Sequence, residues 1–175
     1  MSAAIHRPVR DRSALQVHGT HATLAFRRFL PHPPDRVWKA LTDPADLRQW
    51  FLTEAQVDQR VGGTVDLVTT SSRVHATGRI LAWNPPQLYE YEWNVAASPL
   101  LPDGERTVVR WELAKAPGGT VLSLTHRNLT AKTARIYHRG VPSFLDRLAA
   151  LLAGEPLPDW AAGIRRDVAA GPPQT

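Results

Sequence analysis

The chain has 175 residues, of which 43% are hydrophobic, and it carries a formal net charge of +5 and no cysteine. This length suits one domain with a substantial core and is short for two. The missing cysteines exclude disulfides, thiolate metal sites and cysteine nucleophiles. No apolar run approaches the roughly 18 residues of a membrane span, and the N-terminus has no apolar signal-peptide core. We therefore expect a cytoplasmic protein without a membrane span.

The positive charge comes mainly from arginines, which are scattered along the chain. Adjacent pairs occur only at Arg27-Arg28 and Arg165-Arg166. There is no basic helix and no aromatic-interleaved RNA motif, so we expect no nucleic-acid partner.

The first predicted elements are a strand and two short helices. Residues 1–20 are polar and unpatterned, and we expect them to form a flexible arm before a strand over residues 22–30. The segment HPPDRVWKALTDPADLRQWF (residues 32–51) follows, and its prolines suit the first turns of helices. Asp43 is placed to cap the second helix, whose apolar positions recur at i, i+3 and i+4: Leu47, Trp50 and Phe51.

A series of strands is predicted between residues 54 and 129. The glycine pair at residues 62–63 separates QVDQR from TVDLVTT as a hairpin turn would, and Pro85-Pro86 marks another connection. Further strands are expected over residues 74–83, 88–94, 106–113 and 120–129.

These strands alternate between apolar and polar residues, so the sheet should have one apolar face. In the segment LYEYEW, the three rings share a face opposite Glu90 and Glu92. The residues expected on the apolar face of the last three strands are Tyr89, Tyr91, Trp93, Val109, Trp111, Leu113, Leu122, Leu124 and His126.

The C-terminal part returns to helical spacing. A helical piece over residues 131–139 should lead, through a kink or break at residues 140–142, into a helix that ends at Gly154. Residues 155–175 are rich in proline, glycine and alanine and are expected to form a tail, with at most a helical turn near Trp160. The domain should therefore span residues 21–154.

The order of elements predicts an α+β fold. A curved antiparallel sheet of six or seven strands must cover its apolar face, and the C-terminal helix is the one predicted element long enough to do so.

Four strings resemble successive signatures of one known family. They are HPPDRVWKALTDPADLRQWF, GRILAWNPPQLYEYEW, GGTVLSLTH and HRGVPSFLDRLAALLAGEPLPDW. Their order resembles the START-like (SRPBCC) superfamily, in its heat-shock-protein ATPase activator-like (AHSA-like) branch, over about residues 22–160. The resemblance implies a helix-grip (Bet v 1-like) fold with a hydrophobic cavity between sheet and helix. Many relatives carry Trp where this chain has Val141, which would widen the cavity or be compensated by Phe144.

The expected function is the binding of a small hydrophobic or aromatic molecule in that cavity, such as a lipid or a polyketide-like metabolite. An empty apolar cavity of about 300 Å³ would cost roughly 7 kcal/mol, so a real cavity should be small, wet or filled. The predicted ligand-binding residues are Trp83, Tyr91, Trp93, Trp111, Leu113, Leu124, His126, Tyr137, Val141, Phe144, Leu145 and Leu148. For each of them, simple core packing is the competing interpretation.

Catalysis is the first alternative. The sequence has no His-Glu-x-x-His or Gly-x-Ser-x-Gly motif and no carboxylate pair on the inner face, so we expect no metal and no cofactor. His126, turned inward beside Trp111, is the most interesting polar residue, because a histidine there could orient a ligand or act as an acid or base; His138 is a weaker candidate. The resemblance also includes polyketide cyclases, so a START-like cyclase/aromatase or hydrolase stays open.

Protein interaction is the second alternative. The branch name implies a co-chaperone-like regulator, but the chain shows no second domain that would extend a docking surface. We therefore rank it below ligand binding, and expect a monomer or homodimer.

Overall fold

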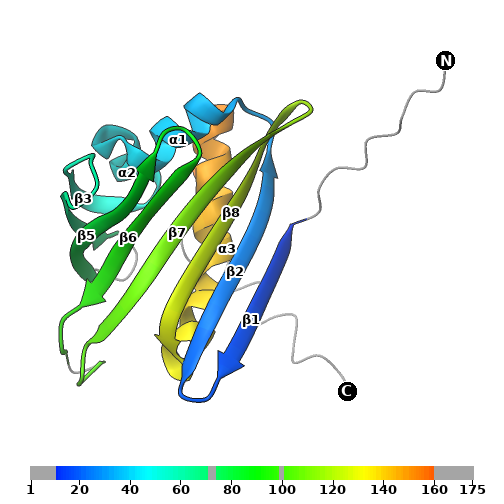
Figure 1. Cartoon of the computed structure of the whole chain (residues 1–175). Helices are drawn as coiled ribbons and strands as arrows, with labels where there is room; N and C mark the ends of the chain where they lie inside the picture. Colours follow the sequence, from blue (N-terminus) through cyan, green and yellow to red (C-terminus); the bar gives the residue numbers. More distant parts are fainter. Residues whose placement is uncertain (1–10, 71–73, 99–100, 160–175) are drawn as a thin grey trace, which may run out of the picture.

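The sheet has eight antiparallel strands in the computed structural model, which describes residues 11–70, 74–98 and 101–159 (Figure 1). Their order is β1-β2-β8-β7-β6-β5-β4-β3, so the first and last thirds of the chain meet where β2 pairs with β8. The elements are β1 (Arg12–His18), β2 (His21–Leu30), α1 (Pro34–Thr42), α2 (Pro44–Trp50), β3 (Leu52–Val57), β4 (Thr64–Thr69), β5 (His75–Asn84), β6 (Leu88–Val95), β7 (Glu105–Ala116), β8 (Gly119–Thr130) and α3 (Ala131–Ala153).

The long helix α3 lies across one face of this sheet, behind β7, β8 and β2 in Figure 1. Of the two short helices, α2 packs beside β3, and α1 contacts β7 and β8. This arrangement confirms the predicted α+β architecture of a curved sheet around a C-terminal helix. The strand count is one higher than the predicted upper limit because of β1.

The expected arm over residues 1–20 is wrong for residues 12–18, which form β1 and pair with β2 from Arg12 to His18. This edge strand is exposed on nearly every side chain, and only Leu15 packs partly against the core. A strand without a buried face shows no apolar alternation, which is why the pattern missed it. Residues 1–10 lie outside the described residues.

The predicted alternation in the sheet is confirmed. In β6, Tyr89, Tyr91 and Trp93 are all buried on the inner face. Cross-strand pairing continues this apolar layer into β7 and β8, where Tyr89 lies opposite Trp111, and Trp111 opposite Leu124. The centre of the inner face is thus built from aromatic rings, and the helices that cover this face pack on them.

The outer face of the same strands carries an ionic cluster. The Glu90 carboxylate receives two hydrogen bonds from Arg127, at 2.8 and 3.1 Å, and one from Arg110 at 3.2 Å. The hydrogen bond with Arg127 is the main reason why the pKa of Glu90 is lowered, and Arg110 adds to it. The cluster ties β6, β7 and β8 together at the back of the aromatic layer.

Of the kink or break predicted at residues 140–142, the break is wrong, because α3 is one continuous helix from Ala131 to Ala153 with Pro142 inside it. A proline removes one helical hydrogen bond, and here packing of α3 on the sheet and on α1 and α2 outweighs that loss. Thr130 caps the helix by accepting from the Thr133 N–H, and Gly154 ends it in the left-handed region at φ 69°, as predicted. The expected tail is described only to residue 159, so Trp160 lies outside the described residues.

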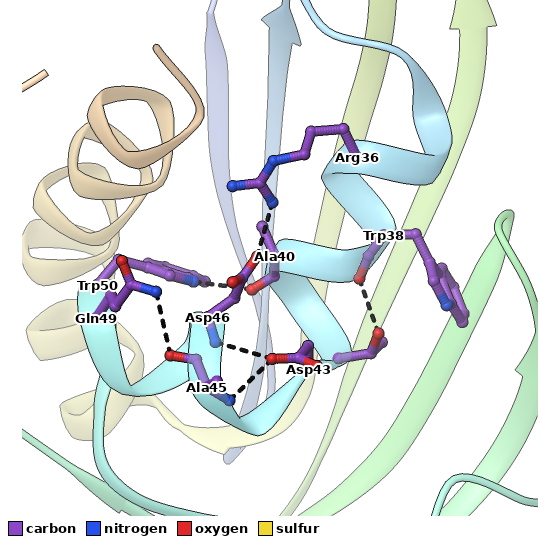
Figure 2. Close-up of polar contacts among 9 residues, drawn as sticks. Arg36, Trp38, Ala40, Asp43, Ala45, Asp46, Gln49 and Trp50 are labelled. Carbon is purple, nitrogen blue, oxygen red and sulfur yellow. Dashed lines mark hydrogen bonds and ion pairs between the residues drawn. The ribbon is translucent and has the colours of Figure 1, made fainter. Parts of the chain in front are cut away.

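The corner between α1 and α2 is held by the cap that the sequence predicts. Asp43 Oδ1 accepts hydrogen bonds from the backbone N–H groups of Ala45 at 2.9 Å and Asp46 at 3.0 Å (Figure 2). Asp46 in turn forms an ion pair with Arg36 of α1 at 2.7 Å. These contacts fix the direction in which α2 leaves α1 and crosses the sheet.

Replacing Asp43 with alanine is expected to lower the free energy of unfolding by about 1 kcal/mol, because two N–H groups at the start of α2 lose their acceptor. Urea unfolding followed by tryptophan fluorescence measures this. Asp43→Asn is the matched control, since the amide oxygen keeps the cap and should restore most of the stability. Equal losses in both variants would show that the side-chain oxygen is not the stabilising element.

Candidate functional site

A small void lies beneath α2. Its volume is about 10 Å³, and it lies where α1, α2 and the start of β3 face the aromatic layer of the sheet. None of its lining residues comes from α3. The lining is Leu41, Leu47, Trp50, Phe51, Leu52, Leu67, Tyr89, Tyr91 and Trp111.

This position differs from the predicted one between sheet and C-terminal helix. Of the twelve predicted ligand-binding residues, Tyr91 and Trp111 line the void. The other ten lie in or beside the core: Trp93, Leu113, Leu124, His126, Leu145 and Leu148 are buried, and Trp83, Tyr137, Val141 and Phe144 are partly buried against it.

The lining residues of α2 and its C-cap were not among the predicted ligand-binding residues. The i, i+3, i+4 spacing of Leu47, Trp50 and Phe51 predicted an apolar helical side, and that spacing was the available signal. The pattern showed that they face inward, but not that they lie opposite Tyr89 and Tyr91 of β6. Contacts between a helix and a strand forty residues later depend on the tertiary fold, so local periodicity does not predict them.

Phe51 occupies the outer edge of the void. The eight other lining residues are buried, whereas Phe51 is partly exposed to solvent. Its ring stacks on Trp50 at 5.1 Å and meets Phe144 of α3 edge-on at 5.0 Å. The Phe51 side chain therefore separates the void from solvent at the junction between α2 and α3.

The backbone next to Phe51 is held from two sides. Trp50 Nε1 donates to the carbonyl of Ala40 in α1 at 2.9 Å (Figure 2), and Arg147 Nε of α3 donates to the carbonyl of Trp50 at 2.9 Å. A second nitrogen of Arg147 donates to the carbonyl of Pro158, in the segment after α3. These hydrogen bonds hold the backbone on the side of Trp50 to both α1 and α3.

Two tyrosines from β6 belong to the lining. Burial raises the pKa of Tyr91 to about 12, and the neighbouring Trp111 side chain offsets only part of this rise. The hydroxyl of Tyr89 has no hydrogen-bond partner among the described residues. A buried hydroxyl without a partner costs about 1–3 kcal/mol, so Tyr89 is an exception that requires an explanation.

His126 is a core residue. Its side chain is buried on the inner face, as predicted, and its ring stacks on Tyr137 at 5.2 Å. Its direct cross-strand neighbour is Val109, and Trp111 is the next inward residue of the same strand. Thr107 donates to the carbonyl of Trp93 at 2.8 Å, so we assign His126 Nε2 as the donor to Thr107 Oγ1 at 2.7 Å. Burial lowers the pKa of His126 to about 3, and the ring stays neutral at pH 7.

Trp93 and Tyr137 complete the polar groups near His126. The Trp93 N–H makes no hydrogen bond of good geometry, although it lies close enough to Tyr137 to oppose the rise that burial causes in the Tyr137 pKa. Neither residue lines the void. Within the residues that the structure describes, no group of three or more potential metal ligands is present.

A larger hollow of about 790 Å³ lies on the surface. It is bordered by the start of α1, the β5–β6 turn and the adjoining ends of β7 and β8. It includes polar side chains such as Asp35, Glu112 and Lys115, and no buried polar atom without a partner belongs to it. The void beneath α2 is therefore the stronger candidate for recognition of an apolar molecule.

A curved antiparallel sheet with a long C-terminal helix across its inner face defines a helix-grip domain. The sequence matches the family model described as Activator of Hsp90 ATPase homolog 1-like protein over residues 31–153. The chain therefore belongs to this family, as the four sequence strings suggested. No helix in the described residues is both long and apolar enough to cross a membrane.

Several solved structures share the fold. CalU16 from Micromonospora echinospora is 23% identical, with a TM-score of 0.69 and coverage of 92% of this chain and 94% of CalU16. Protein MLL2253 from Mesorhizobium loti is 27% identical, with a TM-score of 0.68 and coverage of 77% of this chain and 99% of that one. Among curated proteins, none matches the sequence.

Proposed function

We propose that the protein binds a small apolar or aromatic molecule beneath α2, and that the Phe51 side chain turns outward to admit it. The observation that carries this proposal is the void itself, whose nine lining side chains are aliphatic or aromatic. They come from α1, α2, the residue after α2 and four strands. An interior apolar site closed by a single partly exposed ring is a suitable place for an apolar guest.

The void is too small to hold a ligand unless a side chain moves. An apolar cavity of about 150 Å³ accepts benzene, whereas this void of about 10 Å³ is at the lower limit for one water molecule. A single-ring ligand can therefore enter only if a side chain leaves. Phe51 has the size of the ligand that would replace it, and its ring already reaches solvent.

The lining favours binding over catalysis. It contains no carboxylate, histidine, lysine or serine, and its only ionisable groups are the two tyrosines, whose pKa values are raised by burial. His126, the predicted acid or base, is neutral at pH 7 and does not line the void. A cyclase-like or hydrolase-like reaction would need a proton donor or acceptor that titrates nearer neutrality.

A thermal-shift series with toluene, ethylbenzene and indole tests the proposal. At ten times its dissociation constant a ligand stabilises the native state by about 1.4 kcal/mol, which should raise Tm by about 3–6 °C for a chain of this size. Filling the void with Leu67→Phe should abolish the increase. Leu81→Phe adds the same bulk at an exposed position of β5 and should leave it intact. If no apolar probe raises Tm of the unaltered protein, the proposal is wrong.

A further inference from the structure

The Tyr89 hydroxyl is a buried polar group without a partner at a site whose remaining lining is almost entirely apolar. The residue is 2% exposed, lines the void, and has no hydrogen bond from its hydroxyl to any described residue. By contrast, the N–H of Trp50, which also lines the void, is satisfied, because Nε1 donates to the carbonyl of Ala40. A phenylalanine would fill the same space without an unpaired oxygen, so packing alone does not explain a tyrosine at this position.

The ring of Tyr89 is held in place by three others. It stacks on Tyr91 at a centroid distance of 4.6 Å, and it meets Trp83 at 5.1 Å and Trp38 at 6.4 Å edge-on. These contacts come from α1, β5 and β6, so the hydroxyl is presented from a rigid support. A donor whose direction is fixed before binding loses little entropy when it forms a hydrogen bond.

The hydroxyl keeps its proton in this setting. Burial, and then the neighbouring Tyr91, raise the pKa of Tyr89 well above its ordinary value, so at neutral pH the group is an uncharged donor. No cationic side chain lines the void, so a carboxylate or phosphate would enter without a counter-charge. The complementary partner is therefore a neutral acceptor attached to an apolar frame.

A single water molecule is the simplest competing partner for Tyr89. Buried waters generally make two to four hydrogen bonds. Only two residues of the lining carry a side-chain hydroxyl, and the void of about 10 Å³ is at the lower limit for one water molecule. A carbonyl oxygen needs only the one donor, and the ring that carries it satisfies the aliphatic and aromatic walls.

We propose that Tyr89 is the specificity-determining residue of this site and that it selects uncharged single-ring aromatic carbonyl compounds by donating a hydrogen bond to their oxygen. This inference rests on the proposed function and adds the chemical class of the ligand. In this proposal the Phe51 side chain controls entry of the ligand, and the Tyr89 hydroxyl binds the ligand's oxygen. Mutation can therefore separate the two roles.

The test uses two probes of nearly the same shape, acetophenone and α-methylstyrene, in which a carbonyl oxygen is replaced by a methylene group. Affinities are measured by titration calorimetry for the unaltered protein and for Tyr89→Phe. We expect the variant to lose about tenfold in affinity for acetophenone, the usual effect of one neutral hydrogen bond, and to bind α-methylstyrene within twofold of the unaltered protein. Tyr137→Phe, which removes a hydroxyl away from the void, should change neither affinity.

The possible outcomes distinguish the two proposals. If Tyr89→Phe changes both affinities equally, the donor role is wrong while binding beneath α2 stands. If neither probe binds the unaltered protein, both proposals are wrong. The infrared carbonyl band of bound acetophenone gives a measurement that needs no variant: a shift to lower frequency relative to an apolar solvent is expected, and an unshifted band would overturn the inference.

Discussion

Phe51→Ala is expected to open the void to solvent and to increase the association rate of toluene by about tenfold or more, because binding no longer waits for a side chain to move. The dissociation constant should fall as well, since the ligand takes the volume of the missing ring. Stopped-flow fluorescence measures the rate, with Trp50 stacked on Phe51 as the reporter.

The same substitution should lower the free energy of unfolding by about 2–3 kcal/mol, below the range for a fully buried phenylalanine because Phe51 is partly exposed. Phe144→Ala is the matched control. Its ring packs on Phe51 from α3 and is also partly exposed, but it does not line the void. The control should lose comparable stability and change the association rate by less than about threefold. Equal acceleration in both variants would mean that entry does not depend on Phe51 itself.

A second large effect is expected from pH. Burial holds the pKa of His126 at about 3, whereas an unfolded chain protonates histidine near 6.5. Between these values the unfolded state binds one proton more than the native state, so stability falls as the pH decreases below 6.5. The slope is about 1.4 kcal/mol per pH unit, which amounts to about 3 kcal/mol between pH 6.5 and pH 4.

Urea unfolding of the unaltered protein and of His126→Gln from pH 7 to pH 4 isolates this contribution. The carboxylates titrate in both proteins, so the difference between the two curves reports His126. We expect His126→Gln to be less stable at pH 7, because the hydrogen bond to Thr107 is disturbed, but to lose stability more slowly as the pH falls. His18→Gln, at an exposed position of β1, should reproduce the slope of the unaltered protein. Parallel curves for His126→Gln would contradict the assignment.

Local periodicity was sufficient for most of the fold. Alternation in LYEYEW and in the last two strands identified the buried face, because each of those strands has one side on the core. It failed at β1, which is stabilised by backbone pairing with β2 rather than by burial. At Pro142 local propensity left a kink or a break open, and the packing of a 23-residue helix rules out the break.

The candidate site was less accessible to prediction. The residue pattern showed that Tyr91 and Trp111 point inward, and both line the void. It could not show which helix lies above them, since α2 and α3 both have an apolar side. The choice of α3 followed from its length, whereas the space that remains open is governed by how closely each helix packs. The unpaired state of the Tyr89 hydroxyl likewise depends on contacts across the sheet.

Arg147 links the segment after α3 to the end of α2. One guanidinium joins the carbonyl of Trp50, immediately before Phe51, to the carbonyl of Pro158 beyond the end of α3. Trp50 and Pro158, more than a hundred positions apart, thus accept hydrogen bonds from the same side chain. The segment after the last helix is thereby connected, through Arg147, to the backbone at the wall of the void.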